Sequence, residues 1–344
     1  MASLPALRKA IAIEKTGDFD VIQLLDLPLT PGPGDIVIKT EYMGLNFVDT
    51  SIRSGRYPLP INQPMALGCE ISGTIVALPT DESVLEHAIY KKHGFSVGAR
   101  VVACGGIVYG IHSDYAAVPW AIVTVIPQGV STRAAAAASA QATTALAFVD
   151  QAHNVQKGET ILVHTVAGGV GLFFAQLIKA RGATVIGTTS TKEKAELAKA
   201  HGADHVVLYK EEDTVQRVLE LTGGRGVDAV FDGVGKDTFD NNFKLLKVKG
   251  TLVCVGSTSG YVPPFAPRRL LEKNLKLVNP TLRNYASTPE ELYQYSTELL
   301  ALLASNTVRV HVHKEYPFTV EGAIQAQKDL AGGQTAGKVL IKVD

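Results

Sequence analysis

The stretch that decides the fold is Ile161-Leu-Val-His-Thr-Val-Ala-Gly-Gly-Val-Gly-Leu-Phe-Phe-Ala175. Its pattern predicts a short apolar strand, a glycine turn and the start of a helix. Glycine lets a backbone pass close to a pyrophosphate group, and the N-terminus of the following helix offers free N–H groups to it. Val166 stands where the first glycine of G-x-G-x-x-G would be, so the fingerprint is incomplete. The alternative is a tight turn in an α/β domain that binds no nucleotide.

Strands and helices alternate around this turn, and the alternation is what makes the glycine string informative. The apolar runs are short and continuous, which is typical of strands covered on both faces of a parallel sheet. We therefore expect a doubly wound α/β (Rossmann) domain with the glycine turn at its first strand–helix junction. The predicted strands are residues 160–164, 184–188, 206–209, 227–232, 251–255 and 275–278, and the predicted helices are residues 169–181, 192–201, 214–222 and 238–247.

The end of the second strand distinguishes between the two nicotinamide cofactors. An NAD site expects Asp or Glu there, to hold the ribose 2′-hydroxyl. This chain has Gly187-Thr-Thr-Ser-Thr-Lys-Glu-Lys194 instead, and its only acid, Glu193, is expected to face solvent. Thr189, Ser190 and Lys194 suit a 2′-phosphate, so the sequence predicts NADPH in preference to NADH. The alternative for the lysines is a solvated helix face.

The sequence on either side of this domain differs in kind. Before about residue 130 it predicts short strands and turns, with residues 79–96 as a loop that holds at most one helical turn. The tail predicts a helix over 289–304, a strand over 308–314, a helix over 320–330 and a strand over 338–343. We expect the tail to rejoin the first part, giving a split domain of residues 1–133 and 284–344 around a nucleotide-binding domain of residues 134–283.

Composition narrows the class of protein. The chain has 344 residues with 33 basic and 33 acidic side chains, and zero net charge removes the electrostatic motive for a dedicated nucleic-acid or membrane-surface binder. Cys69, Cys104 and Cys254 are too scattered for a disulfide framework. With neither a signal-peptide pattern nor an apolar run of 18 residues, we expect a cytoplasmic protein with reduced thiols.

Several motifs together carry a resemblance to a known family. They are Gly44-Leu-Asn-Phe-Val-Asp49, Arg53-Ser-Gly-Arg-Tyr-Pro58, Gly68-Cys-Glu-Ile-Ser-Gly73, Ala167-Gly-Gly-Val-Gly171, Asp232-Gly-Val-Gly235, Val255-Gly-Ser257 and Gly337-Lys-Val-Leu340. With them the chain resembles the medium-chain dehydrogenase/reductase superfamily, and most closely its zinc-free NADPH:quinone oxidoreductase (zeta-crystallin-like) branch. The resemblance implies a β-rich GroES-like catalytic domain, a cleft between it and the nucleotide-binding domain, and homodimers formed through edge strands.

The resemblance also implies roles for single residues. Asn46 would lie near the nicotinamide, Tyr57 would line the substrate pocket, Thr144 would lie beside the nicotinamide, and Arg53 would hold its loop or reach the cleft. The ordinary alternatives are an ion pair between Asp49 and Arg53 and a turn closed by Tyr57. The implied cofactor-binding residues are Asn46, Ala167, Gly168, Gly169, Val170, Gly171, Thr189, Ser190, Lys194, Tyr209, Val234, Val255, Ser257 and Asn279.

A zinc site is not expected. Asn46 and Cys69 stand where zinc-dependent members of the superfamily have a cysteine and a histidine ligand, and the third ligand, a cysteine, is missing near Thr143. The favoured chemistry is therefore hydride transfer from NADPH to an acceptor that is already electrophilic, a quinone. One alternative is an NADPH-dependent reductase of enone, alkenal or enoyl double bonds. Another is an RNA-binding or stress/structural protein that retains an NADPH site, although the chain has no aromatic-basic stripe.

Overall fold

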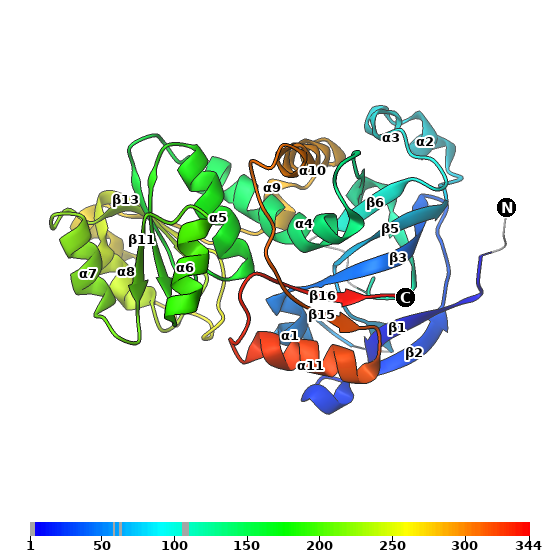
Figure 1. Ribbon diagram of the computed structural model, residues 1–344, viewed down its shortest axis with the longest axis horizontal. Helices are drawn as coiled ribbons and strands as arrows, with labels where there is room; N and C mark the ends of the chain where they lie inside the picture. The colour runs from blue at the N-terminus through cyan, green and yellow to red at the C-terminus, as the bar shows by residue number, and fades with distance from the viewer. Residues whose placement is uncertain (1–3, 58, 62–63, 105–109) are drawn as a thin grey trace. The chain divides into compact units, whose positions relative to one another are not determined.

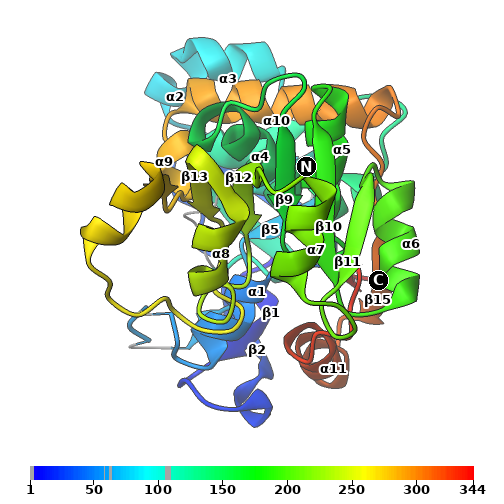
Figure 2. The ribbon, with the colours of Figure 1, turned by 90° about the vertical axis from the view of Figure 1, so that its left-hand side faces the viewer.

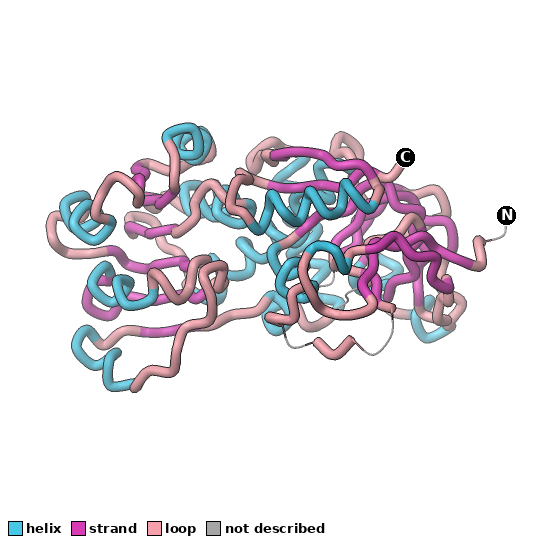
Figure 3. Tube along the Cα trace, turned by 90° about the horizontal axis from the view of Figure 1, so that it is seen from below, coloured by secondary structure: helices cyan, strands magenta, loops and turns pink. Residues whose placement is uncertain are grey.

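The computed structural model describes residues 4–57, 59–61, 64–104 and 110–344, so Pro58 of the quoted motif lies outside the described residues. The chain divides into two compact units, Met1–Thr143 with Ala286–Asp344 and Thr144–Tyr285. Strands predominate in the first unit, whereas strands and helices alternate in the second (Figure 3). Among the described residues, no helix combines the length and the apolar character that a membrane span requires.

The second unit is built on one parallel sheet. Its strand order is β11 (His205–Leu208), β10 (Thr184–Thr189), β9 (Thr160–Val163), β12 (Val227–Asp232), β13 (Leu246–Cys254) and β14 (Lys276–Val278). Every neighbouring pair is parallel, and Figure 2 shows β11, β10, β9, β12 and β13 side by side. The order reverses at β9, as in doubly wound folds, which confirms the predicted fold class.

Helices cover both faces of this sheet. α5 (Gly169–Ala180) and α6 (Lys192–Ala200) lie on one face, and α7 (Thr214–Leu221) and α8 (Phe239–Leu245) lie on the other (Figure 1). The central strands β9, β10 and β12 are buried on both faces, which explains their continuous apolar runs. The predicted helix over 238–247 was too long at its C-terminal end, because Leu246 is fully buried and pairs with Val227 as the first residue of β13.

The first unit is a curved, mostly antiparallel arrangement. One sheet has the order β15 (Val312–Pro317), β16 (Lys338–Lys342), β3 (Asp35–Leu45), β5 (Glu70–Ala77), β6 (Arg100–Cys104) and β8 (Val123–Val125), with β7 (Tyr115–Pro119) also paired to β3. A second sheet has the order β2 (Gln23–Pro28), β1 (Leu7–Ile13) and β4 (Met65–Ala66). The ladder between β3 and β5 shifts register at Thr40–Tyr42, a bulge of the kind that bends a sheet.

The C-terminal tail belongs to this first unit. β16 runs antiparallel to β3, with Leu340 opposite Gly44. α11 (Val320–Ala331) contacts β15, β16 and α1 (Phe47–Arg53), and Figure 1 shows these elements side by side. α10 (Pro289–Ala304) has the bounds expected from its sequence. Two elements of the opposite ends of the chain, β3 and β16, thus share one core.

The 79–96 segment is more ordered than the sequence predicted. It forms α2 (Glu82–Glu86) and α3 (Ala88–His93) rather than a loop. The side chain of Asp81 caps α2 and the Nδ1 atom of His87 caps α3, accepting from the Ile89 N–H at 3.2 Å. Burial lowers the pKa of His93 to about 4, and its ring stacks on Phe95. The sequence did not predict that His87 would cap a helix or that His93 would be buried, and both helices were therefore missed.

Candidate functional site

The glycine turn of the second unit is a tight cradle. Thr165 has a positive φ of 54°, which turns the chain at the end of β9, and its carbonyl oxygen accepts from the Gly168 N–H at 2.8 Å. A Cβ at Gly171 would lie 2.3 Å from the Thr165 oxygen, so only glycine fits there. The first N–H groups of α5 have no acceptor within the helix and are available to an anion.

Val166, the residue that departs from the glycine fingerprint, is accommodated by the neighbouring strand. A Cβ at Gly187 of β10 would lie 2.4 Å from a methyl group of Val166. The Val166 side chain is fully buried, and its N–H donates to the Thr188 oxygen at 3.0 Å. The missing side chain of Gly187 therefore makes room for the extra side chain of Val166, and the turn keeps its shape.

Two lysines lie at the end of β10 and β11. Lys194 is half-buried on α6, and burial and the nearby Lys210 ammonium lower its pKa. Two cations that repel one another in this way form a place where an anion is stabilising. The sequence predicted Lys194 as a ligand of the 2′-phosphate and gave no indication of Lys210, which follows β11. The adjacency of β11 and β10 in the sheet is the fact that brings the two together.

The other predicted residues of the second unit gather at the same edge of the sheet. The Tyr209 N–H donates to the Thr189 oxygen at 3.2 Å, while the ring of Tyr209 is half exposed. The Val255 N–H donates to the Asp232 oxygen at 2.8 Å. Ala167 and Gly168–Gly171 follow β9, Thr189 ends β10 and Ser190 follows it, and Val234, Val255, Ser257 and Asn279 follow β12, β13 and β14. Parallel strands place all of these at one carboxyl edge. Thr144 lies on α4 (Thr132–Ala147), away from these strand ends in sequence.

In the first unit Asn46 is held by a buried ion pair. Its Oδ1 accepts from the Lys338 Nζ at 2.9 Å, and its Nδ2 donates to Glu70 Oε2 at 3.1 Å and to the Gly44 oxygen at 3.3 Å. Lys338 and Glu70 also pair directly, and their side chains are 1% and 0% exposed. The orientation of the Asn46 amide is therefore fixed at both ends. Glu70 and Lys338 lie in quoted motifs, but their pairing across 268 residues left no local pattern to find.

Glu70 has a full set of hydrogen-bond donors. Besides Lys338 and Asn46, the Ser139 hydroxyl donates to Oε1 at 2.9 Å, and the Ala140 N–H donates to the same oxygen. Four donors, one of them an ammonium, satisfy the hydrogen-bonding capacity of this buried carboxyl group. The pair therefore joins α4, β5 and β16 around Asn46.

Asp49 lies beside this pair in a different state. Its Oδ2 accepts from the Asn46 N–H at 2.8 Å, and its Oδ1 has no hydrogen-bond partner in the described part of the chain. Burial raises the pKa of Asp49 to about 7, against the opposing effects of the Asn46 hydrogen bond and Lys338. Burial, with a smaller contribution from Lys338, also lowers the pKa of His112 to about 3, so this ring is neutral. The cluster thus holds one buried ion pair, a neutral His112 ring, and an Asp49 whose carboxyl is protonated below about pH 7.

Arg53 is used by the fold of its own unit. Its guanidinium donates to Gln327 Oε1 at 2.9 Å and to the Gly17 oxygen, and it lies 3.7 Å from Asp18 and over the Phe19 ring. The alternative of an Asp49–Arg53 ion pair was therefore wrong: α1 places Asp49 toward Asn46 and Arg53 toward α11 and the Gly17 turn. Tyr57, at the end of the same segment, is 37% exposed.

These side chains do not make a zinc site. Burial raises the pKa of the Cys69 thiol well above its usual value, so it is not a thiolate, and Asn46 Nδ2 lies 3.8 Å from its sulfur. The Lys338 ammonium supplies the positive charge in this place and would repel a cation. The described residues include no group of three or more His, Cys, Asp or Glu side chains arranged to hold a metal ion.

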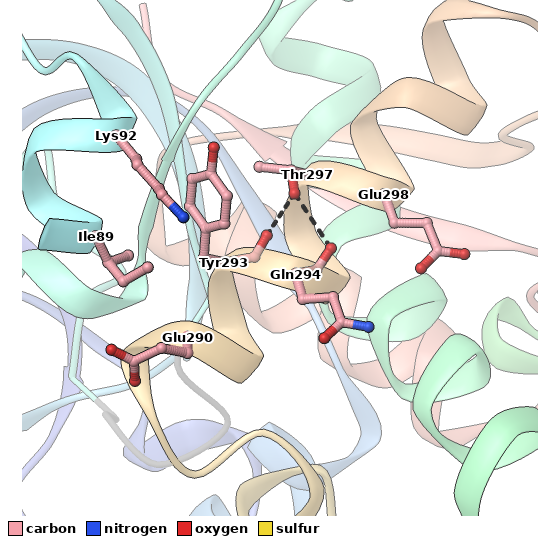
Figure 4. A pocket seen from close by; sticks show the side chains of 7 residues that line it. All are labelled: Ile89, Lys92, Glu290, Tyr293, Gln294, Thr297 and Glu298. Atoms are coloured by element: carbon pink, nitrogen blue, oxygen red, sulfur yellow. Dashed lines mark hydrogen bonds between the residues drawn. The ribbon is translucent and has the colours of Figure 1, made fainter.

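A depression of about 580 Å³ lies elsewhere in the first unit, between α3 and α10 (Figure 4). Ile89, Lys92, Glu290, Tyr293, Gln294, Thr297 and Glu298 line it. The Thr297 hydroxyl donates to the Tyr293 oxygen of its own helix at 2.6 Å and so does not point toward a ligand. None of the predicted site residues lines this depression, and its mixed charges are those of a solvated surface.

Comparisons with known proteins agree with both units. Residues 32–128 match the family described as alcohol dehydrogenase GroES-like domain, and residues 169–301 match the one described as zinc-binding dehydrogenase. Quinone oxidoreductase of Pseudomonas aeruginosa is 35% identical over 337 residues, which cover 97% of this chain and 99% of that protein. The structure of Escherichia coli quinone oxidoreductase complexed with NADPH has a TM-score of 0.88 at 32% identity and covers 98% of this chain and 100% of that one. A 2-haloacrylate reductase of Burkholderia sp is 31% identical, covering 91% of this chain and 92% of that protein.

Replacing Lys338 tests the buried pair. Lys338→Met keeps most of the side chain but leaves the Glu70 carboxylate buried without its cation, and we expect a loss of about 3–5 kcal/mol in the free energy of unfolding. Urea denaturation measures it. The matched control is Lys342→Met on the same strand, whose side chain is 52% exposed, and its effect should stay within about 0.5 kcal/mol. Equal stability of the two variants would contradict the assigned pair.

The raised pKa of Asp49 should make the stability of the protein depend on pH. Its pKa is about 7 in the folded protein and 3.8 as the reference value, so the folded state holds a proton that the unfolded state releases between these values. Its contribution to stability is therefore complete below pH 3.8 and declines as the pH rises toward 7, by up to about 1.4 kcal/mol per pH unit. Asp49→Asn lacks this decline. Urea midpoints from pH 5 to pH 8 should converge between wild type and variant or cross in favour of the variant, and parallel profiles would refute the assignment.

Proposed function

Because the chain belongs to the medium-chain dehydrogenase/reductase superfamily, and within it to the zinc-free quinone oxidoreductase family, we propose that it reduces quinones with hydride from NADPH and without a metal ion. The observation that carries the proposal is the carboxyl edge of the parallel sheet. There the glycine cradle after β9 is followed along the sheet by Thr189, Ser190 and Lys194 after β10 and by Lys210 after β11. No Asp or Glu stands directly at the end of β10, where an NAD site has the acid that holds the ribose.

The cofactor fits the residues of the second unit. In the proposal the turn Ala167–Gly171 and the start of α5 hold the pyrophosphate, because the backbone at Gly168 and Gly169 can approach it closely. Thr189, Ser190, Lys194 and Lys210 hold the 2′-phosphate, and Tyr209 bounds the adenine–ribose end. The nicotinamide half is assigned to Thr144, Val234, Val255, Ser257 and Asn279. The second unit is accordingly the NADPH-binding domain in this proposal, and the first unit the catalytic domain.

The first unit supplies substrate contacts in the proposal. Bound NADPH supplies the hydride; a quinone accepts it without a Lewis acid, because its carbonyl groups are already electron-poor. We assign Asn46 and Tyr57 to orienting the substrate and Arg53 to holding the segment that carries Tyr57. The ion pair of Lys338 and Glu70 keeps the Asn46 amide in one orientation, which favours a fixed substrate pose over a mobile one.

A second candidate function is the reduction of an activated carbon–carbon double bond. The 31% identity to a protein named 2-haloacrylate reductase favours it, since such a reaction uses the same fold and the same hydride donor. The products distinguish the two reactions: a quinone gives a hydroquinone, and a 2-haloacrylate or an enone gives the saturated compound.

We further infer a homodimer in the cytoplasm. The resemblance to the family supports the dimer, and the three free cysteines Cys69, Cys104 and Cys254 support a reducing compartment. Sedimentation velocity of the purified chain tests the oligomeric state, and a species of one chain across a range of concentrations would contradict the dimer.

The proposed activity is tested by the loss of NADPH absorbance with a panel of ortho- and para-quinones, run in parallel with NADH and with and without EDTA. We expect turnover with NADPH, little with NADH and no effect of EDTA. Turnover of enones but not of quinones would move the assignment to the second candidate. Absence of NADPH binding would refute the cofactor assignment.

The lysine pair sets the expected cofactor preference. Lys194→Ala and Lys210→Ala each remove a charge assigned to the 2′-phosphate, so the KM for NADPH should rise about 10- to 100-fold while that for NADH stays nearly constant. Lys192→Ala is the matched control, because Lys192 is exposed on the same helix and has no assigned contact. Steady-state kinetics with both cofactors decide the matter, and an equal rise for NADPH and NADH would count against the assignment.

A further inference from the structure

A buried chain of hydrogen bonds crosses the carboxyl edge of the parallel sheet. His164, directly after β9, has its Nδ1 2.9 Å from the Thr188 hydroxyl of β10 and its Nε2 2.9 Å from Asn242 Oδ1 of α8. The Asn242 Nδ2 in turn donates to Asp232 Oδ2 at 2.7 Å, at the end of β12. These four side chains are between 0% and 5% exposed. Figure 2 shows β10, β9 and β12 next to one another.

The direction of each hydrogen bond in this series can be deduced from Asp232, its last member. Asp232 accepts throughout: Oδ1 accepts from the N–H groups of Val234 and Gly235, and Oδ2 accepts from the Thr238 hydroxyl and from Asn242. The Asn242 amide must therefore direct its NH₂ group to Asp232 and its oxygen to His164. Consequently the His164 Nε2 carries the proton and donates, and in a neutral ring Nδ1 accepts from the Thr188 hydroxyl.

This arrangement ties together the loops that the proposed function uses. The Thr165 hydroxyl donates to the His164 oxygen, and the Val166 N–H donates to the Thr188 oxygen. The glycine turn is therefore hydrogen-bonded to both His164 and Thr188. Thr188 directly precedes Thr189 and Ser190, which are assigned to the 2′-phosphate. Asp232 organises the turn at Val234. Three strand ends are thereby held at a fixed spacing.

We propose that His164 is a positioning residue that sets the spacing between the pyrophosphate loop after β9 and the 2′-phosphate loop after β10, and so contributes to the discrimination between NADPH and NADH. This inference rests on the proposed cofactor site. His164 acts through Thr188, which it holds directly, and touches neither the cofactor nor the substrate in this role.

Removing the imidazole leaves two buried polar groups without partners. In His164→Leu the Thr188 hydroxyl and the Asn242 oxygen lose their hydrogen bonds, and the strand ends must shift to satisfy them. A shift at Thr188 moves Thr189 and Ser190 relative to the glycine turn. NADPH needs both loops at the correct distance, whereas NADH needs only the first, so the two cofactors should be affected unequally.

The experiment measures the dissociation constants of NADPH and NADH for a set of variants by titration calorimetry of the full chain. His164→Leu and Thr188→Val should weaken NADPH at least fivefold more than NADH. His164→Gln should keep the preference of the wild type, because its amide can donate to Asn242 and accept from Thr188. Thr184→Val makes the same substitution at the opposite end of β10 and should leave both constants unchanged.

The double variant identifies the route of the effect. If His164 acts through Thr188, His164→Leu combined with Thr188→Val should show the same NADPH-to-NADH ratio as either single variant, and multiplied effects would overturn the proposal. An unchanged ratio together with a lower urea midpoint would mean a structural role only and would also overturn it. Should His164→Leu fail to fold, Thr188→Val alone carries the test. A wild-type chain that binds no NADPH refutes the proposed function first, and is seen before any variant is made.

Discussion

A carboxylate without access to water is the constraint around which the first unit is organised. Glu70 is acceptable inside the protein only when its charge and its lone pairs are matched, and the matching groups come from β16, from the residue before α1 and from α4. A slip of β16 by one residue would turn Lys338 to the opposite face of the sheet. The ion pair therefore specifies the register with which the tail returns to the N-terminal strands, in addition to fixing the Asn46 amide.

The second unit satisfies a buried carboxylate in another way. Within the described ranges Asp232 makes no ion pair, and it is matched by two backbone N–H groups and two neutral side chains. Its partners lie within ten residues of it, in the turn after β12 and around α8, and only Asn242 continues to another strand end, through His164 after β9. Both units thus use a saturated carboxylate as an organising group, one for register and one for the spacing of loops.

Much of the second unit could be predicted from the sequence, because its strands carry continuous apolar runs and its glycine turn is local. The start of β13 was missed because an apolar residue such as Leu246 fits a helix and a strand equally well. Only its pairing with Val227 shows that it belongs to the strand. The ion pair of Lys338 with Glu70 and the nearness of Lys210 to Lys194 were missed for the same reason. Each depends on which strand lies beside which, and a single sequence contains no measure of that adjacency. The positions of the residues named by resemblance are given above, and their roles in binding and catalysis stay predictions.

The fit of Val166 against Gly187 has a consequence for anyone who moves loops between enzymes of this fold. This turn cannot be transferred on its own, because Val166 fits only where the adjacent strand has no side chain at position 187. Grafting the turn onto a sheet with an ordinary residue at the position of Gly187 would overfill the junction, and restoring a glycine at 166 alone would hollow it. The two positions therefore have to be changed together in engineering, although 20 intervening residues separate them in the chain.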